Sequence, residues 1–178
     1  MLLNKVSDLK TYWHLIGENK EEMDILYQDL LINVTSFFRD SDTYKYLKDT
    51  ILPMLLKLKK EGEAFRVWVP ACSSGEEALS IAIMILEIQE NTGTDIPLQM
   101  FATDLSENAI RKARVGVYSK DELESVSPKR LQRFFTKTGS NYRISKTIRD
   151  TLIYATHNVL KDPPFSRIDF ISCRNLFI

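Results

Sequence analysis

The chain has 178 residues, enough for one globular domain with a small appendage, and its 24 basic residues balance 24 acidic ones. No stretch is long and apolar enough to span a membrane, and Cys72 and Cys173 are too few for a disulfide framework. These features exclude a membrane-inserted protein and a disulfide-stabilised scaffold. We expect a cytoplasmic protein with free thiols.

The first third of the chain is predicted to be helical. Apolar spacing, capping residues and a proline define three helices there: 6–14, 20–32, and one from Asp42 to Leu58 that is kinked or restarted at Pro53.

After residue 60, predicted strands alternate with predicted helices. The strands are expected at 65–69, 98–103, 152–156 and 168–173. The helices are expected at 75–90, at 107–115 with Ser106 as N-cap, and after Ser127-Pro128. A hairpin is expected at 134–144, around a turn at 138–141. This alternation predicts an α/β fold, with a parallel sheet covered by helices and an inserted hairpin.

The run from Val69 to Glu77, between the first strand and its helix, is rich in small residues. A strand, a tight turn and a helix start form the first half of a nucleotide pocket. Only Gly75 of the usual glycines is present, which disfavours a dinucleotide-dependent oxidoreductase. The successive glutamates Glu76 and Glu77 suit the helix dipole but would repel a pyrophosphate. A positively charged cofactor fits better, and S-adenosylmethionine carries a sulfonium and an ammonium.

The segment from Arg111 to Arg149 is basic, with eleven lysines and arginines against three acidic residues. Such a segment is either a solvated surface or a docking face for an acidic protein or nucleic acid. Lys129, Arg130 and Arg133 would share one face of a short helix within it.

Five motifs occur in order along the chain: Asn33-Val34-Thr35-Ser36-Phe37-Phe38-Arg39; Arg66-Val67-Trp68 followed by Ser74-Gly75-Glu76-Glu77 and Ser80-Ile81-Ala82; Ala102-Thr103-Asp104; His157-Asn158-Val159-Leu160; and Cys173-Arg174-Asn175. Together they resemble the chemotaxis receptor methyltransferase family, CheR, over roughly residues 20–178. The sequences of these motifs are most similar to those of the family branch that is fused to a receptor methylesterase.

The resemblance implies a Rossmann-like fold typical of S-adenosylmethionine-dependent methyltransferases. On this basis we divide the chain into an N-terminal helical segment and linker helix at 1–60 and a partial methyltransferase domain at 61–178. An inserted subdomain lies at about 117–150. The family sequence continues beyond Ile178, so we expect a fragment whose last strand leaves an exposed sheet edge and permits self-association.

The resemblance also implies methyl transfer from S-adenosylmethionine to glutamate side chains of the chemoreceptor cytoplasmic domain. No nucleic acid partner is then expected. Arg39 would be the catalytic residue that orients the incoming carboxylate, and Lys129, Arg130 and Arg133 would dock the receptor. The cofactor-binding residues carried over by motif are Asn33, Thr35, Arg39, Glu77, Asp104, Asn158, Val159, Asn175 and Leu176.

Each assignment has a structural alternative. Asp104 would instead cap the next helix, Glu76 would take the place of Glu77, and Arg39 would be a surface residue beside two buried phenylalanines. The asparagines would only turn the chain at strand ends. His14 and His157 have no ligand spacing around them, so no metal site is expected.

Two other functions remain open from the residues. One is a methyltransferase that acts on a small molecule or nucleic acid. The other is a non-catalytic signalling module that binds S-adenosylmethionine without turning it over.

Overall fold

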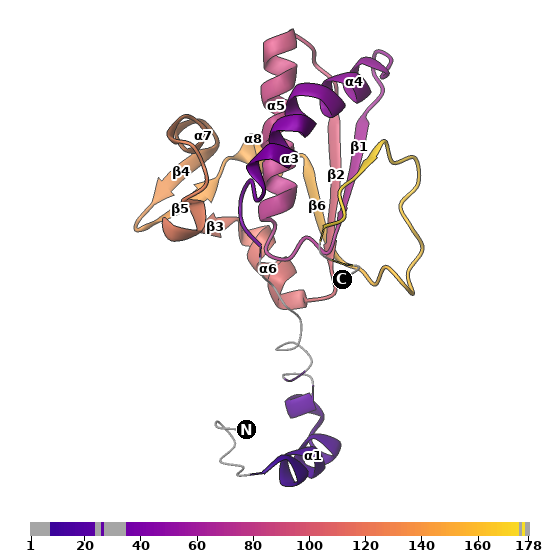
Figure 1. Ribbon diagram of the computed structural model, residues 1–178, viewed down its shortest axis with the longest axis vertical. Helices are drawn as coiled ribbons and strands as arrows, with labels where there is room; N and C mark the ends of the chain where they lie inside the picture. Colours follow the sequence, from indigo (N-terminus) through magenta and orange to yellow (C-terminus); the bar gives the residue numbers. More distant parts are fainter. Residues whose placement is uncertain (1–7, 24–25, 27–34, 175, 177–178) are drawn as a thin grey trace. The chain divides into compact units, whose positions relative to one another are not determined.

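A computed structural model of the chain describes residues 8–23, 26, 35–174 and 176 (Figure 1). The chain divides into two compact units, residues 1–33 and residues 34–178. The described residues from 35 to 60 therefore belong to the second unit, not to an N-terminal segment that ends at residue 60.

The first unit contains α1 (Leu9–Glu18). The helix begins later than the predicted range 6–14 because the Asp8 carboxylate accepts a hydrogen bond from the Thr11 backbone N–H at 2.9 Å and so caps it. Residues 20–23 are helical, and most of the predicted helix 20–32 lies outside the described residues.

The second unit is built on a four-stranded parallel sheet with the order β6-β2-β1-β7. Its strands are β1 (Phe65–Pro70), β2 (Leu98–Asp104), β6 (Leu152–Thr156) and β7 (Phe170–Ile171). The predicted α/β class is thus confirmed. The last strand is shorter than the predicted 168–173, because only Phe170 and Ile171 pair with β1, opposite Val67 and Trp68.

Helix α5 (Glu76–Thr92) packs along one face of this sheet (Figure 1). Phe65, Val67 and Val69 of β1 point into that core and are fully buried. The following helix, α6 (Glu107–Val115), contacts β2 and β6. Alternation along β1 sends Arg66 and the neighbouring tryptophan to the other face.

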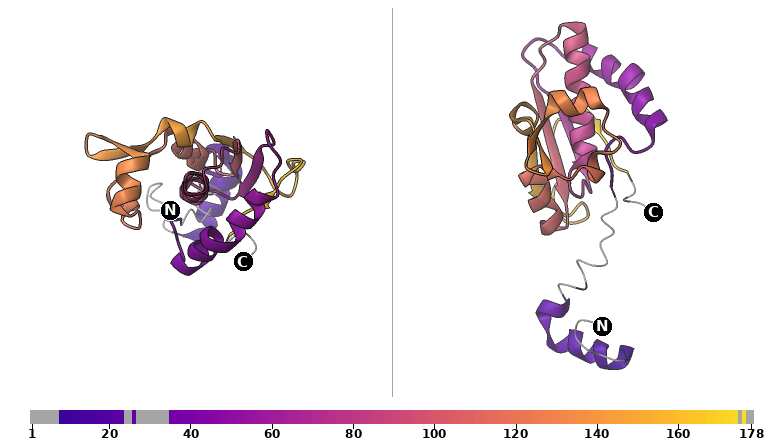
Figure 2. Two further views of the ribbon diagram at one scale, coloured as in Figure 1. Left: turned by 90° about the horizontal axis from the view of Figure 1, so that it is seen from above. Right: turned by 90° about the vertical axis from the view of Figure 1, so that its left-hand side faces the viewer.

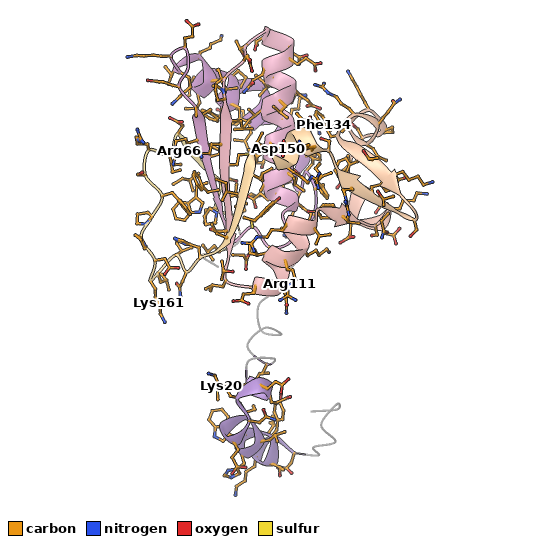
Figure 3. The ribbon with its side chains drawn as sticks, turned by 180° about the vertical axis from the view of Figure 1, so that it is seen from behind. Lys20, Arg66, Arg111, Phe134, Asp150 and Lys161 are labelled. Carbon is orange, nitrogen blue, oxygen red and sulfur yellow. The ribbon has the colours of Figure 1, made fainter. Side chains whose placement is uncertain are left out.

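The connection at 157–169 covers part of that other face. The Phe165 ring stacks on Phe101 with centroids 4.4 Å apart and meets Trp68 edge-on at 5.3 Å. Figure 3 shows Arg66 on β1 and Lys161 in this long connection.

The helical stretch before β1 consists of α3 (Ser41–Tyr46), a π-helical turn (Leu47–Ile51) and α4 (Leu52–Lys57). Asp40, rather than the predicted Asp42, is the N-cap residue. Pro53 lies in the first turn of α4, directly after the π-helical turn. The helical backbone continues without a break from α3 to α4, and the predicted change at Pro53 takes the form of the π-helical turn just before it rather than a restarted helix.

A small antiparallel sheet with the order β3-β5-β4 follows α6 and lies beside α5, apart from the main sheet (Figure 2). The strands of this sheet are β3 (Val117–Tyr118), β4 (Phe135–Thr138) and β5 (Asn141–Ile144). The same part of the chain also forms a 3₁₀ turn (Asp121–Leu123) and the helices α7 (Pro128–Phe134) and α8 (Lys146–Arg149). The predicted hairpin is β4–β5. Neither β3 nor α8 was predicted.

Candidate functional site

The candidate site lies at the carboxyl ends of the parallel strands. The chain passes from β1 to β2 on one side of β1, and it returns as β7 on the other side. Such a reversal of strand order is the place where open α/β sheets bind ligands. Most of the motifs identified in the sequence follow directly after these strands.

The loop at 71–75, between β1 and α5, has a strained backbone. Ala71, Ser73 and Gly75 have φ angles of 54°, 50° and 97°, so every second residue is in the left-handed region. The Cys72 backbone N–H donates to the carbonyl of Thr103 at 2.9 Å, which ties the loop to β2. Non-glycine residues hold such angles only where their surroundings fix them, typically at functional sites.

Gly75 is required by both its backbone angle and its surroundings. A Cβ atom there would lie 3.0 Å from the Tyr154 hydroxyl and 3.1 Å from the Ala113 Cβ. The Tyr118 hydroxyl would lie 3.3 Å from that Cβ, and it donates a 2.7 Å hydrogen bond to the carbonyl of Ser74. The small β-sheet thus reaches the loop through one buried tyrosine.

Asp104, at the end of β2, fastens the same loop. One carboxylate oxygen accepts from the Ser73 N–H at 2.8 Å, and the other accepts from the Ser106 N–H at 2.9 Å. Ser106 itself caps α6 by accepting from the Ala109 N–H, so Asp104 does not fill that role. A carboxylate has about four acceptor positions, and two remain on this partly exposed group for the hydroxyls of a ribose.

The two glutamates at the start of α5 face different surroundings. The Glu76 carboxylate accepts from the Ser74 hydroxyl at 2.8 Å, on the side of Lys112. Glu77 accepts from the Ser172 hydroxyl at 2.5 Å and has Arg174 nearby, so it lies at the end of β7. Burial raises the pKa of both glutamates, and their serine partners oppose the change. Glu77, not Glu76, therefore faces the reversal point of the sheet.

The segment at 35–40 contains a turn at Phe37 and Phe38 and no helix, so Thr35 and Arg39 do not share a helix face. Phe38 and Asp40 have φ angles of 49° and 62°, which no helix accommodates. Phe37 and Phe38 are buried, as expected, whereas Arg39 is exposed and Thr35 is half-buried. Tertiary packing of the two phenylalanines determines the conformation of this segment.

The remaining candidate cofactor residues are only partly placed. The Asn158 side-chain oxygen accepts from the Leu160 N–H at 3.0 Å, which is the turn-forming role considered as its alternative. Val159 and Leu176 are half-buried. Asn33 and Asn175 lie outside the described residues, so their assignment stays a prediction.

Two of the three candidate docking residues on α7 form ion pairs with α5. Arg130 makes two 2.8 Å hydrogen bonds to the Glu87 carboxylate, and Arg133 pairs with Glu90. Lys129 is exposed and has no ion pair among the described residues. These two arginines therefore hold α7, which precedes β4 of the small sheet, against α5.

Sequence reasoning missed three side chains that the structure brings to the site. Ser172 contacts Glu77, Tyr118 holds the loop at Ser74, and Arg174 bonds the turn at 35–40. Ser172 directly precedes the Cys173-Arg174-Asn175 motif and Arg174 lies within it, which was the available signal. Nothing local marked Tyr118, because its role depends on a contact over 44 positions.

The described residues include no group of three or more histidine, cysteine or acidic side chains that could hold a metal ion. They also include no helix long and apolar enough to cross a membrane.

Comparison with known proteins identifies the class to which this fold and site belong. Residues 33–178 match the family model described as "CheR methyltransferase, SAM binding domain". The chain therefore belongs to this family, and its cofactor is S-adenosylmethionine.

Three relatives illustrate the match. The whole chain is 36% identical, over 178 residues, to 19% of an "Uncharacterized 104.1 kDa protein in hypE 3'region" from Rhodobacter capsulatus. It is 34% identical, over 84% of its length, to 55% of a "Chemotaxis protein methyltransferase" from Listeria monocytogenes. It is 31% identical, over 87% of its length, to 58% of "Chemotaxis protein methyltransferase 1" from Pseudomonas aeruginosa. The chain thus spans little more than half of these two methyltransferases.

The donor set fits this cofactor. The buried Glu77 carboxylate supplies negative charge toward its positive groups, and the remaining acceptor positions of Asp104 suit its ribose hydroxyls. The strained loop of small residues between them leads directly into the start of α5.

Proposed function

We propose that this chain binds S-adenosylmethionine at the carboxyl end of its main sheet and supports methylation of glutamate side chains on chemoreceptors. The observation that carries the proposal is the position of Glu77 and Asp104. Glu77, at the start of α5, binds the end of β7, and Asp104, at the end of β2, binds the 71–75 loop. The two carboxylates therefore flank this loop. Relatives named as chemotaxis protein methyltransferases support the choice of substrate.

The chain's residues have few chemical tasks in this reaction. When bound, S-adenosylmethionine supplies an activated methyl group. A glutamate side chain is already ionised near neutral pH, so the chain needs no general base. Glu77 and Asp104 hold the cofactor, and Arg39 holds the incoming carboxylate through its planar guanidinium. Positioning and charge stabilisation account for the rate.

The test is methyl transfer from radiolabelled cofactor to purified cytoplasmic fragments of chemoreceptors. We expect base-labile label on receptor glutamates, and no label when those glutamates are replaced by alanine. Cofactor binding without transfer to any receptor would favour the non-catalytic signalling module. Transfer of label to RNA, DNA or small molecules would favour a different methyltransferase.

A further inference from the structure

The turn at 37–40 is held by contacts from separate parts of the second unit. The Ser125 hydroxyl, from the small-sheet segment, donates to the carbonyl of Phe37 at 2.6 Å. The Phe38 N–H donates to the Ser80 hydroxyl of α5 at 3.0 Å. A turn with two non-glycine residues in the left-handed region needs such contacts to persist.

Arg174, just beyond β7, supplies the third contact. One guanidinium nitrogen donates to the carbonyl of Arg39 at 2.8 Å, and the other pairs with the Asp40 carboxylate. The guanidinium carbon lies 5.7 Å from the centroid of the Tyr44 ring. One side chain therefore binds a backbone carbonyl, a carboxylate and an aromatic face, across about 135 positions of the sequence.

These contacts connect the turn to the candidate site. Glu77, which binds Ser172 at the end of β7, has Arg174 as a nearby positive charge. The same Arg174 bonds the peptide group of Arg39, the residue expected to orient the substrate carboxylate. The end of β7 thus fixes a cofactor-side residue and a substrate-side residue together.

We propose that Arg174 is a positioning residue for methyl transfer: it fixes the backbone from which the Arg39 side chain projects. The proposal rests on the proposed function, because Arg39 is assigned to the substrate there. Arg174 touches neither cofactor nor substrate in this role. A lysine would keep the charge but lacks the planar fork that serves two acceptors and the ring, so it would replace Arg174 only in part.

The first test compares variants in the methyl-transfer assay. For Arg174→Gln we expect kcat to fall by about tenfold or more, since small misplacements of reacting groups are costly. The cofactor Kd should stay within about twofold, and Arg174→Lys should recover part of kcat. In an Arg39→Ala background, Arg174→Gln should cause no further loss. Losses that multiply in the double variant would overturn the proposal, as would an unchanged kcat in Arg174→Gln.

A second readout does not depend on activity. Hydrogen exchange in the peptide covering 35–44 should become faster in Arg174→Gln. The control is Lys59→Gln, which removes a 3.1 Å ion pair with Asp169 at the opposite end of β7 and should leave that peptide unchanged. Unchanged exchange in Arg174→Gln would overturn the positioning role. If the unmodified chain transfers no methyl group, the proposed function fails, while the exchange result still judges the role of Arg174 in the turn.

Discussion

The Ser172 hydroxyl lies 2.5 Å from Oε1 of Glu77, and both side chains are buried. This hydrogen bond joins the end of β7 to the first turn of α5 across the point where strand order reverses. It favours the ionised carboxylate, whereas burial disfavours it, and burial has the larger effect on the pKa. The charge state of Glu77 is therefore sensitive to small changes around it.

We predict that cofactor affinity falls on acidification through the pKa of Glu77, which burial raises above 4.5. Protonation removes the negative charge that faces the cofactor's positive groups. Tyr44, which also packs there, has its pKa raised to about 12 by burial and by Glu77, so it stays neutral throughout. Calorimetric titration with S-adenosylmethionine at successive pH values measures the effect.

Three variants separate this interpretation from its alternatives. Glu77→Gln should bind weakly with no acid dependence, and Ser172→Ala should move the fall to higher pH, because a bond to the charged form is lost. Glu76→Gln should keep the acid dependence, since that carboxylate bonds Ser74 instead. Normal affinity in Glu77→Gln would remove Glu77 from the cofactor site.

Asp104→Ala should weaken cofactor binding by roughly 1–3 kcal/mol, the cost of leaving polar ligand groups and the Ser73 N–H without a partner. The matched control is Asp169→Ala. Asp169 also accepts a backbone N–H, from Arg66 at 2.8 Å, but it lies at the amino end of β7. Its loss should lower stability and leave affinity unchanged. Equal effects of both variants on affinity would mean that Asp104 acts only through general stability.

The sheet could be predicted from the sequence because its strands are short apolar runs that alternate with helices marked by capping residues. Val67 and Val69 are buried as expected, and Ser106 caps α6 through its hydroxyl. The position of Asp104 also followed from its place at a strand end. These features depend on local chemistry and on alternation, both of which are visible along the chain.

The missed features depend on distant contacts. No local pattern predicts the turn at 35–40, in which the Phe37 ring packs edge-on against the distant Tyr118, with centroids 5.0 Å apart. The strand β3 has only two residues, and its pairing with β5 bridges more than twenty positions. The sequence indicated Arg174 only as part of a motif, because its partners Arg39, Asp40 and Tyr44 lie far away in the first half of the chain.

Glu87 should make the fold sensitive to acid. Burial raises the pKa of its carboxyl, but the bonds to Arg130 and Lys48 more than offset this and lower the pKa from 4.5 to about 2. A lowered pKa stabilises the folded state above pH 4.5, and that stability is lost as pH falls toward 2. Denaturant unfolding across this range should show the loss. Glu87→Gln should be less stable at neutral pH and show a smaller acid dependence; an identical dependence would assign the effect to other groups.

Lys129 is the residue of the α7 cluster best suited to meet an acidic receptor. Arg130 and Arg133 already pair with α5, so their reversal would also loosen the fold. Lys129→Glu should slow association with receptor fragments and flatten its salt dependence, without changing cofactor affinity. Lys137→Glu, an equal charge change on exposed β4, is the control. Normal receptor methylation with lost affinity for RNA or DNA would favour the nucleic acid alternative.

The two outer strands of the main sheet differ in how their edges are protected. At β6 the Arg114 guanidinium donates to the carbonyl of Tyr154 at 2.7 Å, so part of that edge is occupied. At β7 the Ile171 side chain is 52% exposed, and no strand among the described residues pairs with its outer side. An uncovered edge with apolar side chains is a template for association between chains.

We therefore expect the chain to self-associate through β7 as its concentration rises. Ile171→Lys should reduce the association, because a charged side chain at the edge opposes pairing with a second copy. Ile153→Lys, at a similarly exposed isoleucine on β6, should leave it unchanged. Sedimentation velocity over a range of concentrations distinguishes the variants. A chain that stays monomeric at high concentration, or equal effects of the two substitutions, would show that β7 is not the associating edge.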